Sequence, residues 1–158
     1  MTTSNVKRIN NSDIQPRRMD FEFDDSIPVY WFAGDQFKSI LLTSLSCTFP
    51  EGERFFIEAV RDVRDQMAPG TLPQRLLNDI KLFIRQEGFH GREHEQWTQA
   101  LIEMGYTGLA EFDARQKKLR EWGRRKFDPL SRLGSTVAME HFTAIIGSLV
   151  LYKRPALI

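Results

Sequence analysis

Residues 72–104, LPQRLLNDIKLFIRQEGFHGREHEQWTQALIEM, carry the clearest structural signal in the chain. The apolar positions of this stretch are Leu76, Leu77, Ile80, Phe83, Ile84, Trp97 and Leu101. Most of them are spaced by three or four residues, which predicts one long helix. Thr71 and Gln74 have the spacing of a capping box at its start, and Gly105 fits the cap at its end.

Helical spacing also predicts the structure on both sides of this segment. Three further helices are predicted, at residues 37–66, 109–126 and 129–152. Pro50 should introduce a kink or a break in the first of these. Asp35 and Asp128 stand where they can cap the helices that follow them. Alternation typical of strands is nearly absent, so the predicted fold class is all-α.

Length and composition narrow the classes of function. The chain has 158 residues, of which 41% are apolar and 27% charged, as in one globular domain. We expect residues 1–26 to form a polar leader and residues 27–158 to form the helical domain. The formal charge of +1 argues against a global field that recruits nucleic acid or an anionic membrane. No apolar run reaches the roughly 18 residues of a membrane span, and a single cysteine, Cys47, favours a reducing, cytoplasmic location.

Three polar side chains occupy the apolar side of the helix predicted at residues 72–104. The stripe continues through Glu87, His90 and His94 before it reaches Trp97. Glu87 and His90 are one turn apart, as are His90 and His94, so either pair could share a metal ion. A buried carboxylate or imidazole is costly unless a metal ion or another partner compensates for it. The alternative is a polar cluster hydrogen-bonded to arginine side chains.

Two glycines interrupt the same helix beside these polar residues. Gly88 and Gly91 each cost about 1 kcal/mol relative to alanine in a helix interior. We therefore expect them to leave room beside the ligands, or to let another helix approach closely.

The first and last predicted helices also place a glutamate on an apolar stripe. Glu53 lies on the stripe of the first helix, and Glu140 on that of the last. A first-turn acid facing the positive end of the helix dipole is the alternative for Glu53. Glu51, beside the break, is predicted to be exposed, and Glu58 to lie on a solvated face. His141 points away from Glu140 and is predicted to have a structural or surface role.

Three helices thus supply a glutamate, and one of them adds histidine. In ferritin-like di-metal bundles, two helices each supply a Glu and two others supply a Glu-x-x-His motif. We predict a ferritin-like helical bundle that lacks the second Glu-x-x-His motif. Ligands without thiolate favour iron, with manganese or zinc as alternatives. His94 is predicted to be the catalytic base or an added ligand, and the predicted metal ligands are Glu53, Glu87, His90 and Glu140.

A longer series of motifs points to a family. The motifs are PRRM (16–19), WFAGD (31–35), FPEGERFF (49–56), QEGFH (86–90) with His94, and MEHFTA (139–144). Together they resemble the bacterial proteins described as predicted metal-dependent hydrolases. The resemblance covers nearly the whole chain from about residue 16, and implies a ferritin-like fold and a metal-dependent activity. It also implies that the chain corresponds to the N-terminal part of the family, because members usually continue into a further helix with a Glu-x-x-His-type motif. The bundle is then incomplete in this chain, which is a truncated product or is completed by a partner or second copy.

Two classes of function follow from these features. The first is a metal-dependent enzyme that acts on a small molecule, with water activated for hydrolysis or dioxygen activated by two irons. The second is a non-catalytic helical module that forms a homodimer through the faces left open by the missing helix. The basic residues between positions 115 and 126 predict a solvated helix face, because no nucleic-acid recognition motif accompanies them.

Overall fold

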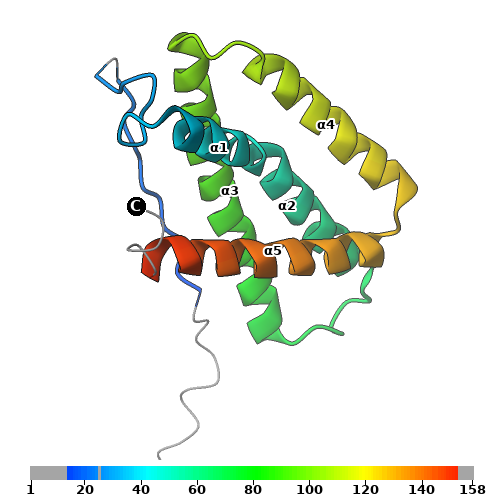
Figure 1. Cartoon of the computed structure of the whole chain (residues 1–158). Coiled ribbons are helices and arrows are strands. Elements are labelled where there is room, and N and C mark those ends of the chain that lie inside the picture. The colour runs from blue at the N-terminus through cyan, green and yellow to red at the C-terminus, as the bar shows by residue number, and fades with distance from the viewer. Residues whose placement is uncertain (1–13, 25, 153–158) are drawn as a thin grey trace, which may run out of the picture.

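The computed structural model describes residues 14–24 and 26–152. All regular secondary structure there is helical, which confirms the predicted all-α class. The helices are α1 (Gln36–Ser46), α2 (Phe49–Gln66), α3 (Gln74–Glu103), α4 (Leu109–Lys126) and α5 (Pro129–Tyr152). α2 packs most extensively on α3, and α5 crosses α2 (Figure 1). Over the part of the chain that the structure describes, none of the helices has the length and apolar character to cross a membrane.

The predicted helix at residues 37–66 consists of two helices. The chain turns just before Pro50, where the Thr48 N–H donates to the Leu45 carbonyl at 3.0 Å, and α2 begins at Phe49. Proline has no N–H, and its ring collides with the carbonyl four residues earlier in a continuous helix. Pro50 is therefore tolerated in the first turn of a new helix, which confirms the predicted break.

Aspartates begin two of the helices, as predicted. Asp35 Oδ1 accepts a hydrogen bond from the Lys38 N–H at 2.9 Å at the start of α1. Asp128 Oδ1 accepts from the N–H groups of Leu130 and Ser131, each at 3.0 Å, at the start of α5. These carboxylates satisfy N–H groups that have no partner within the helix.

Of the two caps predicted for α3, the one at its start is wrong and the one at its end is confirmed. The capping box predicted at Thr71 is wrong, because α3 begins at Gln74 after Pro73 and no side chain caps it. Pro73 keeps Leu72, the residue before it, out of the helical conformation. The helix therefore cannot begin directly after Thr71. Gly105 ends the helix as predicted, with a φ of +96° and its N–H bonded to the Ile102 carbonyl at 3.0 Å.

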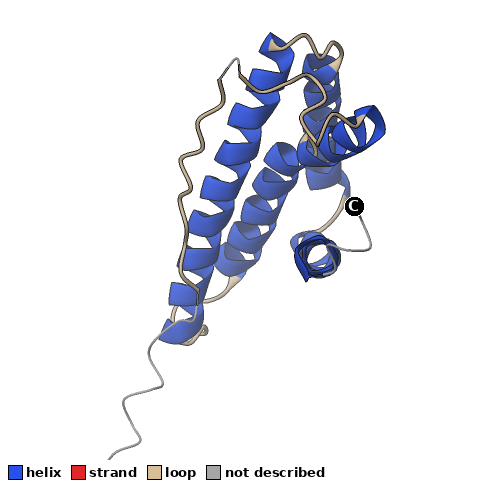
Figure 2. Ribbon diagram, turned by 60° about the vertical axis from the view of Figure 1, so that its left-hand side comes forward, coloured by secondary structure: helices blue, strands red, loops and turns tan. Residues whose placement is uncertain are grey.

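The leader runs as an extended segment along α3 over its described residues, 14–24 (Figure 2). Residues 1–13 of the predicted leader lie outside the described residues. Three backbone N–H groups of the segment bond to α3: Arg17 to Gln86 Oε1 at 2.8 Å, and Asp20 and Phe21 to Glu93 at 3.3 and 3.1 Å. The leader is thus fixed to α3 by side chains that accept its backbone hydrogen bonds.

α5 buries polar side chains where the spacing predicted apolar ones. Arg132 is only 4% exposed and donates to Asp62 Oδ2 of α2 at 2.8 Å, and Thr136 is also buried. Val137, an apolar residue three positions before Glu140, is 63% exposed. The ion pair with α2 selects the face of α5 that packs, and spacing alone does not reveal it. The exposed apolar side chains of α5 include Leu130, Val137, Phe142, Ile145, Ile146 and Leu149.

Candidate metal centre

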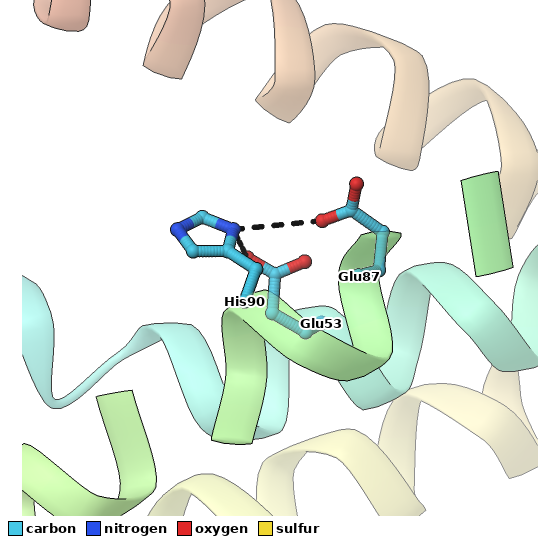
Figure 3. A group of neighbouring side chains, drawn as sticks. All are labelled: Glu53, Glu87 and His90. Atoms are coloured by element: carbon cyan, nitrogen blue, oxygen red, sulfur yellow. Dashed lines mark ion pairs between the residues drawn. The ribbon is translucent and has the colours of Figure 1, made fainter. Parts of the chain in front are cut away.

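Glu53 of α2 meets Glu87 and His90 of α3 in the middle of the bundle (Figure 3). Glu53 is 2% exposed and Glu87 is 7% exposed, while the His90 ring is partly open to solvent. His90 Nδ1 lies 2.8 Å from Glu53 Oε1 and 3.6 Å from Glu87 Oε2. Each residue offers one ligand atom, and the three atoms lie within 4.8 Å of one another. Three of the four predicted ligands therefore come together.

Close packing of α2 on α3 brings these side chains together. Gly91 follows His90 directly, and a Cβ atom added there would lie 3.2 Å from Glu53 Cβ and 3.4 Å from its Cγ. The missing side chain at residue 91 lets α2 approach, as predicted. Gly88 does not mark such a close approach, because an added Cβ there meets nothing within 4 Å.

Burial and mutual contact give the two carboxyl groups different acidities. Burial raises the pKa of Glu53 to about 8, against the opposing hydrogen bond from His90, and the nearby Glu87 raises it further. Burial also acts to raise the pKa of Glu87, but hydrogen bonds with His90 and Glu53 outweigh it and lower that pKa. Glu53 is thus the member of the pair that holds a proton more tightly.

His90 lies between the two carboxyl groups of the cluster. Hydrogen bonds to Glu53 and then Glu87 raise its pKa to about 10, against the opposing effect of burial. Glu53 Oε2 is buried and has no hydrogen-bond partner in the described part of the chain. A buried acceptor of this kind is costly unless something binds it. Two carboxylates, an imidazole and a free buried oxygen fit a divalent cation, which binds these donor types.

His94 lies one turn beyond His90 and outside the group of metal donors. Its Nε2 is 3.0 Å from His90 Nε2, and its Nδ1 is 2.7 Å from Ser46 Oγ. The ring stacks on Phe49 with a centroid distance of 4.4 Å. Burial, and next the charge of His90, lower the pKa of His94 to about 4. A neutral His94 is therefore held in line with Ser46 and His90.

Glu140 of α5 faces the cluster without joining it. Its carboxyl is partly buried, and Oε1 has no hydrogen-bond partner among the described residues. Burial raises its pKa first, and the charge of Glu87 raises it further. Glu140 is thus near enough to interact electrostatically with Glu87, but lies outside the three residues whose donor atoms come within 4.8 Å.

Two expectations about the surface of α2 were wrong. Glu51, predicted to be exposed, is buried, with ion pairs to Arg54 and to Arg120 Nε at 2.6 Å. Glu58, predicted on a solvated face, is only partly exposed and also pairs with Arg120 of α4. Arg120 lies more than 60 positions from both glutamates, so no local pattern identifies it as their partner.

Two residues near the histidines had no role in the sequence predictions. Ser46 is the last residue of α1 and reaches His94, although 48 residues separate them. Glu93 is buried, and its carboxylate accepts hydrogen bonds from two backbone N–H groups of the leader. Glu93 directly precedes His94, so the sequence places it beside the histidines. No pattern in the neighbouring residues indicates its contact with the leader.

The described chain is thus an all-helical bundle whose centre carries a Glu/His group that could hold a metal ion. The chain belongs to the family described as predicted metal-dependent hydrolases, whose model matches residues 15–157. No curated protein and no solved structure matches the chain.

Proposed function

We propose that this protein is a metal-dependent hydrolase whose divalent ion is held by Glu53, Glu87 and His90. The observation that carries the proposal is the convergence of these three donors from two helices, with Glu53 Oε2 buried and without a hydrogen-bond partner among the described residues. Three protein ligands leave coordination positions for water and substrate, as in catalytic metal sites. Membership of the family supports the same conclusion.

The donor set favours iron, with manganese or zinc as alternatives. When bound, a single ion supplies a water of lowered pKa for attack on an ester or amide-like bond, whereas two irons favour reaction with dioxygen. Dioxygen chemistry is the second candidate, supported by Glu140 on the facing helix, whose Oε1 has no hydrogen-bond partner in the described part of the chain. Glu140 would then be the fourth ligand of a ferritin-like site.

The residues around the ion have separate proposed roles in metal binding and proton transfer. When they lose their protons on metal binding, Glu53 and Glu87 would supply negative charge to hold the cation, and His90 would supply Nδ1. We assign His94 the role of catalytic base or added ligand, because its ring lies between Ser46 and His90, next to the proposed metal ligands. The substrate is proposed to be a small molecule rather than nucleic acid.

A non-catalytic homodimer is the alternative function. It is supported by the apolar side chains that α5 leaves exposed, among them Phe142 and Ile145. In that case the buried acids would have a structural role alone.

Metal content separates these functions. The full chain is purified without added metal and analysed by elemental mass spectrometry, together with Glu87→Gln and Glu103→Ala. Glu103 is an exposed residue of the same helix and serves as the control. We expect near-stoichiometric metal in the wild type and the control, and loss of metal in Glu87→Gln. A folded wild type that stays metal-free after reconstitution, or equal metal in all three proteins, would contradict the proposal.

A further inference from the structure

A cavity of about 930 Å³ lies between the leader, α1 and α3, and reaches His90 and His94. Its volume is within the range of small-molecule sites, about 300–1,000 Å³. Of the three clustered metal donors, only His90 lines it, so the cavity is a separate space that adjoins the metal centre. Ser46, bonded to His94, also lines it.

One end of the cavity is aromatic. Trp97 of α3 contacts Phe23 of the leader at a centroid distance of 4.9 Å and Trp31 at 5.3 Å. All three rings line the cavity, as does Leu42 of α1. Side chains of this kind bind hydrocarbon groups by removing apolar surface from water.

The opposite end is polar and carries a positive charge. Arg17 and Gln86 line it, and the Arg17 N–H donates to Gln86 Oε1 at 2.8 Å, which fixes the leader there. Among the described residues, no ion pair engages the Arg17 guanidinium. Glu93 also lines the cavity, but its carboxylate accepts hydrogen bonds from the leader backbone and from Arg92. The charge left for a ligand at this end is therefore that of Arg17.

The cavity is also elongated. Gln86 and Trp97 lie 11 positions apart on α3, which corresponds to about 16 Å along the helix axis. His90 and His94 stand between them. The space therefore fits a chain-like molecule with its polar group toward Arg17 and its hydrocarbon part toward Trp97.

We propose that this cavity binds an acyl compound, with its carboxyl group beside Arg17 and His90 and its unbranched hydrocarbon chain against Trp31 and Trp97. The proposal rests on the hydrolase function, because it places an acyl ester next to the metal centre. In hydrolysis the acyl carbon–oxygen bond breaks, water supplies OH to the acyl carbon, and its remaining proton goes to the leaving alcohol oxygen. The carboxylate product stays in the cavity, so a free carboxylate is a suitable probe.

Binding of dodecanoate to the full chain tests the proposal without any need for activity. Calorimetry measures the affinity, and tryptophan fluorescence reports on Trp31 and Trp97. Leu42→Trp fills the cavity, and Leu41→Trp is the matched control, because Leu41 is the preceding residue of α1, is 53% exposed and does not line the cavity. Circular dichroism confirms that each variant is folded.

We expect one dodecanoate per chain, with affinity lowered about tenfold or more by Leu42→Trp and unchanged by Leu41→Trp. Arg17→Ala should weaken dodecanoate binding and leave dodecanol binding unchanged. Absence of dodecanoate binding to the folded wild type, or equal affinity in Leu42→Trp, would overturn the proposal. Equal effects of Arg17→Ala on both probes would overturn the assignment of the carboxyl end.

Glu87→Gln keeps this test distinct from that of the metal site. We expect this variant to lose metal and still bind dodecanoate, because Glu87 does not line the cavity. A wild type that binds metal but no dodecanoate refutes the acyl cavity alone. A wild type that binds dodecanoate but no metal refutes the hydrolase function alone.

Discussion

Replacement of Gly91 by alanine probes the contact that brings α2 to the metal centre. The added Cβ would lie 3.2 Å from Glu53 Cβ, so one of the two helices must move by a few tenths of an ångström. Alanine gains up to about 1 kcal/mol in helix propensity, whereas an overpacked contact costs about 1–3 kcal/mol. We expect Gly91→Ala to lower the free energy of unfolding by up to about 2 kcal/mol.

Gly88→Ala is the matched control, three residues earlier on the same helix. An added Cβ there meets nothing within 4 Å, so only the propensity gain remains. We expect this variant to raise the free energy of unfolding by up to about 1 kcal/mol. Urea unfolding of the metal-free proteins at one pH measures both changes.

The same pair of variants should differ in metal affinity. Displacement of Glu53 disturbs a ligand position, and changes next to metal ligands typically lower affinity about 10–100-fold. We expect a loss of about tenfold in Gly91→Ala and no loss in Gly88→Ala, measured by competition with a chelating dye. If both variants are equally stabilised and bind metal equally well, the close approach at Gly91 has no part in positioning Glu53.

Two further predictions concern charged residues outside the metal centre. Arg120→Ala should destabilise the fold by about 3–5 kcal/mol in urea unfolding, because it leaves the buried Glu51 without one partner. Arg115→Ala, at an exposed ion pair, is the control and should change stability by less than about 1 kcal/mol. Similar losses in both variants would refute the difference between the buried and the exposed ion pair. Hydrogen bonds from the side chain and backbone of Ser131 lower the pKa of Asp128 in the folded protein. The Asp128 cap therefore stabilises the fold fully at pH values above the pKa of Asp128 in the unfolded chain. This stabilisation is lost as the pH falls through the pKa of Asp128 in the folded protein. Asp128→Ala should therefore lower the urea midpoint at neutral pH, with a difference from wild type that shrinks in acid; a difference independent of pH would contradict this.

Local patterns were enough to predict most of the helices. The caps at Asp35 and Asp128 and the terminating Gly105 depend on residues within one turn, and each is found in the structure. The wrong cap at Thr71 also has a local cause, because Pro73 excludes the preceding residues from the helix. Where one turn of chain determines the outcome, the sequence contains the necessary information.

Contacts between side chains of different helices could not be predicted in the same way. Arg132 is buried because Asp62 of α2 faces it, which turns α5 so that Val137 is exposed. The leader covers α3 because Glu93 accepts its backbone hydrogen bonds. Backbone contacts of this kind leave no periodic signal, and the cavity under the leader therefore has no signature in the sequence either.

Glu51 and Glu53 show which part of a buried-acid pattern carries functional information. The two residues lie two positions apart on α2, and both are buried. Both oxygens of Glu51 are bound by arginine side chains, so a structural ion pair accounts for its burial. Glu53 binds His90 through one oxygen, and no cationic side chain of the described residues binds the other. Glu53 also lies within a group of three residues that could hold a metal ion, which is why Glu53, rather than Glu51, is the proposed ligand.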